Sequence, residues 1–271
     1  MPECLGREYR MQLPVLLLTV IILAMIVPPA QAMHPLATDD TGTQGPGGVL
    51  VESSINYLKD NEFKSTVVPV AVTLGIGETM DAAVEMPYLS LRPSPATGNN
   101  ESGLSDVVFR FKHRFYEQEK KSGGRDHHEQ SLAYQVAFSQ PTGNEEKGLG
   151  AGKSRWGGRL ISTTEWEAVE INANLGYESS GRALRRGNFT FEHAVAMSIA
   201  AKYERSKPWE PVVELAVVRV KETDIFSRIA NALVGLIYEP SEHYYADAGI
   251  RVGLNANSED YGFLAGFGYK F

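Results

Sequence analysis

Cysteine is almost absent from this chain, since the only one among its 271 residues is Cys4. The rest of the sequence therefore has no disulfide framework, no thiolate metal ligands and no thiol nucleophile. Basic residues are also in the minority, with 26 Lys and Arg against 33 Asp and Glu and a net charge of −7. This balance argues against a nucleic-acid partner. No cofactor or metal is expected.

Long apolar runs are scarce too, and the one present lies at the N-terminus. Arg7 and Arg10 precede an apolar run from Leu13 to Val27, followed by a proline pair and an A-x-A site ending at Ala32. A retained membrane helix would need about 20 apolar residues. The shorter run is typical of a secretory signal peptide. We expect residues 1–32 to be cleaved after Ala32.

The last eleven residues, 261–271, alternate strictly. Odd positions are aromatic or Ala, and even positions are Gly, Leu or Lys. Side chains of a strand point alternately to opposite faces, so one face is aromatic and the other small or cationic. Aromatic side chains facing lipid and small ones facing a lumen are typical of a transmembrane β-barrel.

The terminal aromatic residues also resemble the signal that the bacterial outer-membrane assembly machinery reads, with Phe267, Tyr269 and Phe271 as the residues involved. The resemblance implies export to the outer membrane of a Gram-negative bacterium. The partners that it implies are periplasmic chaperones, the assembly machinery and outer-membrane lipid.

Alternating segments recur along the rest of the chain at the length of a tilted membrane strand. The twelve segments are about 49–58, 63–74, 80–91, 104–116, 129–139, 156–167, 168–178, 188–204, 209–220, 230–239, 243–254 and 258–271. They predict an all-β fold, a single closed antiparallel barrel over 49–271 with about 12 strands.

An even strand number keeps both termini on the periplasmic side, with short turns there and longer loops outside. Ranges 92–103, 140–155, 179–187 and 221–229 are predicted extracellular loops. The charged stretch 117–128 breaks this pattern, because it is long and falls on the periplasmic side. Trp156 and Trp166 are ten residues apart and should share one face, at the two edges of the apolar band.

Three motifs suggest chemistry but lack its geometry. Residues 148–154 resemble a phosphate-binding loop without its first glycine, and we interpret them as a flexible extracellular loop. His127 and His128 are adjacent, which does not preorganise a metal site. His193 and Ser198 have opposite parity on one strand, so they should not form a catalytic pair. The sequence predicts no enzyme.

Strand parity places a set of charged side chains in the lumen, where charge is tolerated against water or an ionic partner. The predicted lumen-lining residues are Glu52, Asp81, Glu85, Arg110, Lys112, Arg114, Glu170, Glu192, Glu214, Asp247 and Arg251. They either only cross-link the interior or form a polar channel with a basic strip on segment 104–116.

The segment after the expected cleavage site reads HPLATDDTGTQG from His34 to Gly45. This opening resembles that of the outer-membrane family named for the meta-pathway of phenol degradation, whose members are described as transporters. The resemblance implies a channel-like barrel for small solutes, including aromatic or hydrophobic compounds. The alternatives are a closed structural or adhesive barrel and, third, a lipid-modifying enzyme. Residues 33–48 are too polar for a strand; they should lie at the periplasmic mouth or form a partial plug.

Overall fold

The computed structural model describes residues 34–60, 63–93, 99–121, 127–183, 189–222 and 225–271. It contains thirteen strands and one short 3-10 helix, η1 (Glu204–Ser206). The strands are β1 (Val49–Lys59), β2 (Phe63–Gly77), β3 (Met80–Pro93), β4 (Glu101–Leu104), β5 (Val107–Lys121), β6 (His127–Gln140), β7 (Arg155–Trp166), β8 (Val169–Ala183), β9 (Phe189–Tyr203), β10 (Trp209–Glu222), β11 (Ile225–Ser241), β12 (Tyr244–Gly253) and β13 (Tyr261–Lys270).

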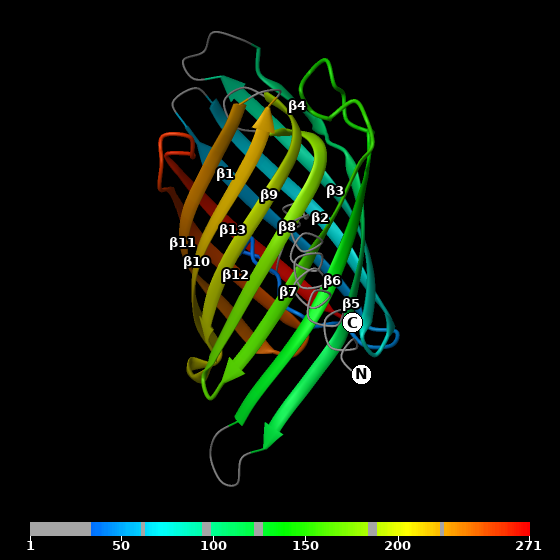
Figure 1. Ribbon diagram of the computed structural model, residues 1–271, viewed down its shortest axis with the longest axis vertical. Coiled ribbons are helices and arrows are strands. Elements are labelled where there is room, and N and C mark those ends of the chain that lie inside the picture. The colour runs from blue at the N-terminus through cyan, green and yellow to red at the C-terminus, as the bar shows by residue number, and fades with distance from the viewer. Residues whose placement is uncertain (1–33, 61–62, 94–98, 122–126, 184–188, 223–224) are drawn as a thin grey trace, which may run out of the picture.

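Twelve of the strands form one closed antiparallel barrel, and β4 is a short extra strand on the edge of β3 (Figure 1). Strands that follow each other in the sequence pair, except that β4 does not pair with β5; instead β5 pairs directly with β3. The last strand closes the ring on the first, from Leu50–Lys270 to Lys59–Tyr261. Closure leaves no unpaired edge around the ring, which is how a sheet can satisfy its backbone in lipid. The twelve-stranded barrel predicted from the sequence is confirmed.

No helix among the described residues is both long enough and apolar enough to span a membrane.

The two sides of the wall differ as the alternation predicts. On β13, Phe263 and Phe267 are about half exposed, whereas Leu264 and Gly268 are buried. On β7, both Trp156 and Trp166 are exposed, at opposite ends of the strand. Polar and charged side chains are instead buried on the inside. An apolar outer surface around a polar interior is the reverse of a water-soluble protein and suits a lipid environment.

Four loop predictions need correction. Within 117–128, the described residues are strand: β5 runs to Lys121 and β6 begins at His127, and these paired strands extend beyond the rest of the barrel (Figure 1). Range 92–103 contains most of β4, 179–187 begins with the last residues of β8, which ends at Ala183, and 221–229 is mostly strand, because β10 ends at Glu222 and β11 begins at Ile225. Charged residues made these stretches look like loops, but strand pairing beyond the membrane is compatible with charge.

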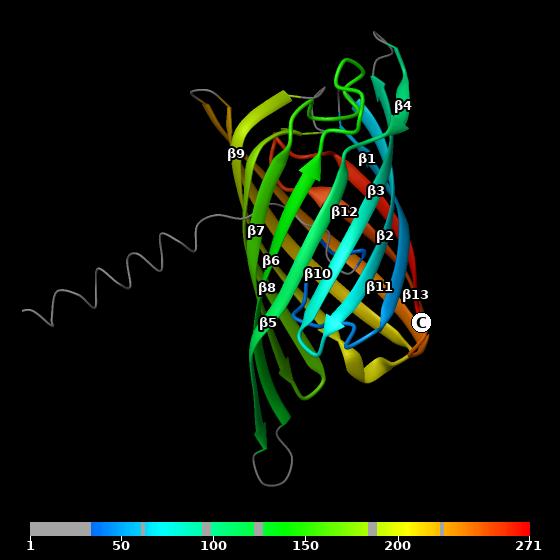
Figure 2. The ribbon, with the colours of Figure 1, turned by 90° about the vertical axis from the view of Figure 1, so that its right-hand side faces the viewer.

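The barrel has two distinct ends. At the C-terminal end, β1 begins and β13 ends, and the Phe271 N–H donates to the Val49 carbonyl at 2.8 Å. At the opposite end, which we call the loop end, residues 141–154 fold over the rim (Figure 2). Asp106 accepts hydrogen bonds there from the N–H groups of Gly143 and Ala151, at 3.0 and 2.8 Å. Leu149 packs inward against Leu89 and Leu91. The predicted flexible loop is thus a folded one.

Candidate functional site: an occupied lumen

The N-terminal segment, residues 34–44, runs through the interior of the barrel. Its hydrogen-bond partners are side chains of strands on different sides of the ring, among them Glu214 on β10, Asn174 on β8, Thr163 on β7 and Asp81 on β3. A segment that contacts strands on different sides of a closed ring has to lie within it. We call residues 34–44 the plug segment; it is the blue trace inside the barrel in Figures 1 and 2.

Glu214 anchors the middle of the plug segment. Its Oε2 accepts hydrogen bonds from the backbone N–H of Ala37 at 2.6 Å, the N–H of Thr38 at 2.7 Å and the Thr38 hydroxyl at 2.8 Å. The Glu214 side chain and Thr38 are both buried. Hydrogen bonds to an ionised acceptor away from water are stronger than neutral ones. Strand β10 therefore holds the segment at one fixed height in the lumen.

Asp39 is surrounded by polar groups from four strands, β5, β6, β7 and β8. Its Oδ2 accepts a hydrogen bond from Gln135 Nε2 at 3.0 Å and lies 3.8 Å from Arg159 NH1. Its Oδ1 lies 3.5 Å from Lys112 Nζ. Asn174 completes the shell: its Oδ1 accepts from the Asp39 N–H at 2.7 Å, and its Nδ2 donates to the Asp39 carbonyl at 2.8 Å. The buried carboxylate is paired and hydrogen-bonded, as a charge away from water requires.

The ends of the plug segment are also held. The His34 imidazole contacts the Asp247 carboxylate through Nδ1 and Asn56 Oδ1 through Nε2, the latter at 2.6 Å. The Gln44 N–H donates to Asp81 Oδ1 at 3.0 Å. Between them, the Thr41 N–H donates to Thr163 Oγ1 at 3.0 Å. The polar opening of the chain, unsuitable for a strand, is matched by polar side chains along the wall.

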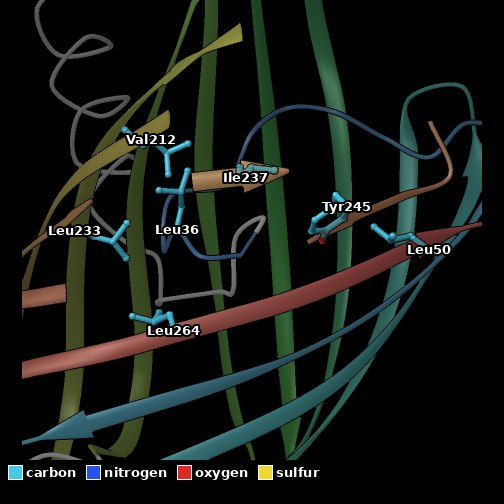
Figure 3. Packing of buried hydrophobic residues seen from close by; sticks show 8 residues of the cluster. Leu36, Leu50, Val212, Leu233, Ile237, Tyr245 and Leu264 are labelled. Carbon is cyan, nitrogen blue, oxygen red and sulfur yellow. The ribbon is translucent and has the colours of Figure 1, made fainter. Parts of the chain in front are cut away.

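An apolar cluster supports the segment beside these polar contacts (Figure 3). Leu36 packs there among side chains contributed by β1, β9, β10, β11, β12 and β13. The members are Leu36, Leu50, Ala200, Val212, Leu233, Ile237, Tyr245 and Leu264. Because Leu36 is the plug segment's contribution to this core, moving the segment out of the lumen exposes apolar surface and costs free energy.

Two cavities remain on either side of the plug segment. The larger, about 460 Å³, is bounded by the segment and by β1, β2, β3, β5 and β13. The smaller, about 230 Å³, is lined by Arg114, Glu170, Lys202 and Glu210, with Lys202 Nζ 3.0 Å from Glu170 Oε2. Asp40 and Gly42 line both cavities. The plug segment therefore divides the lumen.

The structure places ten of the eleven proposed lumen residues on the inside. Glu52, Asp81, Glu85, Arg110, Lys112 and Arg251 line the larger cavity, Arg114 and Glu170 the smaller, and Glu214 and Asp247 hold the plug segment. The side chain of Glu192 lies outside the described residues, as do those of His127 and His128. Arg110 NH1 donates to Glu85 Oε2 at 3.0 Å, so the basic strip of β5 faces carboxylates on β3.

Sequence reasoning missed several residues of this site. Arg159 and Lys202 carried a signal, because their strand parity matches that of inward neighbours such as Thr163 and Ala200. Asp39 and Asp40 had none, since they lie in a segment without periodicity. Which strands these residues contact is decided only when the ring closes, because closure brings side chains of separate strands around the segment.

The remaining motifs do not form a catalytic group. The His193 ring stacks on Tyr177 with 6.0 Å between centroids, whereas Ser198 belongs to the inward set of β9 together with Ala194 and Ala200. His193 and Ser198 thus lie on opposite sides of the wall, as their opposite parity predicts. No group of three metal-ligating side chains occurs in the part of the chain that the structure describes.

A closed antiparallel ring of twelve strands with an apolar outside, a charged inside and an internal plug defines a transmembrane β-barrel. The chain belongs to the family described as "Putative MetA-pathway of phenol degradation", whose model matches residues 34–271. The resemblance noted at the N-terminus therefore holds over the whole described length. No curated protein matches it in sequence.

One solved structure shows the same fold at low sequence identity, and two others are less similar. The crystal structure of an outer membrane channel from Pseudomonas putida is similar, with a TM-score of 0.65 and 10% identity, over 86% of this chain and 98% of that one. The NanC porin has a TM-score of 0.49 at 10% identity, over 82% and 100% of the two chains. The CymD monoaromatic hydrocarbon channel has a TM-score of 0.45 at 8% identity, over 92% and 97%.

Proposed function

We propose that this protein is an outer-membrane channel for small solutes whose resting lumen is narrowed by its own plug segment. The observation that carries the proposal is the division of a closed, charged lumen into two cavities by residues 34–44. The end where the chain terminates is the periplasmic one in this proposal, and the loop end is extracellular. Residues 1–32 act as the cleaved signal that brings the chain there.

The family name supports aromatic or hydrophobic compounds as the solutes. The larger cavity fits a small molecule of mixed character. Leu50, Leu58 and Val67 line it from β1 and β2, whereas Arg110 and Lys112 line it from β5. Cavities of roughly 300–1,000 Å³ with a mainly apolar lining and a few polar groups are typical of small-molecule sites.

Electrical recording in planar bilayers tests the proposal. We expect the full chain to show small currents, because the plug segment fills the lumen. A variant lacking residues 34–44 should conduct several-fold more, provided that it still migrates as a folded barrel on unheated gels. Asp39→Asn, which removes one charge from the segment without shortening the chain, should fall between the two.

The result that would contradict a channel is a folded barrel that passes neither ions nor small solutes in liposomes, with or without residues 34–44. That outcome would favour a structural or adhesive barrel. Removal of residues 140–155 and 179–187 at the loop end should then abolish that activity and leave insertion intact. Loss of lipid hydrolysis or transfer on changing His193 or Ser198 would instead support an enzyme.

A further inference from the structure

The ladder between β1 and β2 is interrupted at one place. Cα pairs run from Val49–Leu74 to Ser53–Val70 and resume at Asn56–Val67. In the same register, Pro69 would face Ser54 across this gap. Proline has no N–H, so it cannot donate the ladder hydrogen bond that would reach Ser54. The Pro69 carbonyl accepts a hydrogen bond from the Ser53 hydroxyl at 3.0 Å. We call the β1–β2 contact around Ser54 and Pro69 the β1–β2 seam. The barrel wall is weakened there, because one backbone hydrogen bond between the two strands is missing.

The larger cavity reaches the wall at the interruption. Its lining includes Ser54 and Asn56 from β1 and Val67 and Pro69 from β2, which flank the gap on both sides. Two residues with outward parity, Ser53 and Phe267, also line it, and they are cross-strand partners on β1 and β13. No other strand residue in the described lining has outward parity. The cavity therefore comes closest to the outside along β1, next to the gap, where Ser53 is the last residue paired with β2.

The outer face of the seam is apolar. Ile55 and Val70 are exposed there, at 55% and 41%. Val51 lies two residues from Ser53 on β1 and pairs with Tyr269, one of the aromatic residues near the C-terminal end of the barrel. Aromatic residues mark the edge of the apolar band of a membrane barrel. The seam lies on the inner side of that edge, within the band, and therefore faces hydrocarbon. On the inner side, the four residues that flank the gap, Ser54, Asn56, Val67 and Pro69, are uncharged, whereas the charged strip of Glu85, Arg110 and Lys112 lies on β3 and β5.

We propose that the β1–β2 seam at Pro69 is a lateral port, through which a small uncharged apolar solute passes between the larger cavity and the hydrocarbon core of the membrane. The port rests on the proposed channel function and adds a route and a solute class to it. Opening it requires separating the two strands only where Pro69 already deprives the ladder of a donor. Charged solutes have no such route, since they would enter hydrocarbon unpaired.

Pro87 provides the matched comparison. It is the cross-strand neighbour of Pro69 on β3. Its carbonyl accepts a hydrogen bond from the Ser105 N–H at 2.8 Å, on the side of β4 and β5. Pro87 does not belong to the described lining of the larger cavity. Replacing either proline with alanine restores one backbone donor, but only Pro69→Ala restores it at the proposed port.

The test measures access from the membrane to a thiol in the lumen. Ser54→Cys is made in a Cys4→Ser background and reconstituted in liposomes. It is reacted with N-phenylmaleimide, which partitions into the bilayer, or with a water-soluble sulfonated methanethiosulfonate. Ala196→Cys, an inward position on the uninterrupted β8–β9 and β9–β10 ladders, is the control site. Pro69→Ala and Pro87→Ala are then added to each.

We expect N-phenylmaleimide to label Ser54→Cys faster than Ala196→Cys. Pro69→Ala should slow this labelling by about fivefold, the factor expected for one backbone hydrogen bond. Pro87→Ala should leave it unchanged, and labelling by the water-soluble reagent should not respond to either proline.

Equal labelling of the two thiols by N-phenylmaleimide, or equal effects of the two proline replacements, would overturn the port. Bilayer currents test the channel separately. A conducting barrel without selective labelling of Ser54→Cys would contradict only the lateral port. A folded barrel without conduction or solute flux would contradict the proposed channel function itself.

Discussion

Glu214 on β10 accepts hydrogen bonds from both the backbone N–H and the hydroxyl of Thr38, so a barrel strand and the plug segment share one buried carboxylate. This contact fixes the segment across the lumen. Four predictions follow from this arrangement and from the two ends of the barrel.

Replacement of Glu214 by alanine should loosen the plug segment. Three donors lose an ionised acceptor, and hydrogen bonds to charged groups contribute about 1.5–3 kcal/mol each. We expect the variant to spend at least about tenfold more time in a high-conductance level in planar bilayers, a factor that needs only about 1.4 kcal/mol. Glu178→Ala is the control, because Glu178 pairs with Arg155 and not with the segment. Equal currents from both variants would argue against Glu214 as an anchor.

Acid should release the plug segment only at low pH. Burial raises the pKa of the Asp40 carboxyl, but the ammonium groups of Lys112 and Lys202, the Gly42 N–H and the charge of Lys270 together lower it by more, so this pKa lies below its ordinary value of 3.8. A group whose pKa is lowered by folding stabilises the folded state above the unfolded pKa, and this stability is lost as the pH falls through the folded pKa.

Conductance should accordingly stay constant between about pH 7 and pH 5 and increase below about pH 4. Asp40→Asn should conduct more at neutral pH and lose the Asp40 part of the acid response. Bilayer recordings over this pH range measure both. A wild-type increase already between pH 7 and pH 5 would show that another group controls the segment.

Leu149 should hold the loop over the barrel rim. It is 3% exposed and packs against Leu89 and Leu91. Loss of a buried leucine costs about 2–5 kcal/mol. Leu149→Asp should therefore release residues 141–154 and make trypsin cleave faster at Lys147 and Lys153. Leu104→Asp, at a 64% exposed leucine, should leave cleavage unchanged. The same cleavage rate in both variants would contradict a packed loop.

Deletion of Phe271 should affect assembly in cells far more than folding in vitro. The side chain is 74% exposed, and burial of one such aromatic contributes at most about 2 kcal/mol. We expect a severe loss of outer-membrane abundance, because the assembly machinery is proposed to read the chain end, but a nearly normal folded fraction after refolding from urea into detergent. Similar losses in both measurements would make Phe271 an ordinary packing residue.

The strands could be predicted because each carries its own period-two pattern. The alternation of Phe263, Phe267 and Phe271 with small residues requires no long-range information, and it set both the orientation of the side chains and the closed all-β fold. Strand ends were less accurate: 117–128 looked like a loop, since charged residues beyond the membrane obey no lipid constraint, and only pairing showed the β5–β6 hairpin.

The sequence alone determined that residues 33–48 could not be a strand, but it left their position open between the periplasmic mouth and the lumen. Tertiary structure decided it, because Asp39 is stabilised only where Lys112, Gln135 and Arg159, from three different strands, converge. The same holds for Pro69: the sequence shows a proline within an apolar strand, but only the register with Ser54 shows which seam lacks a donor. Local periodicity specifies a strand, whereas contacts across the lumen exist only once the ring has closed.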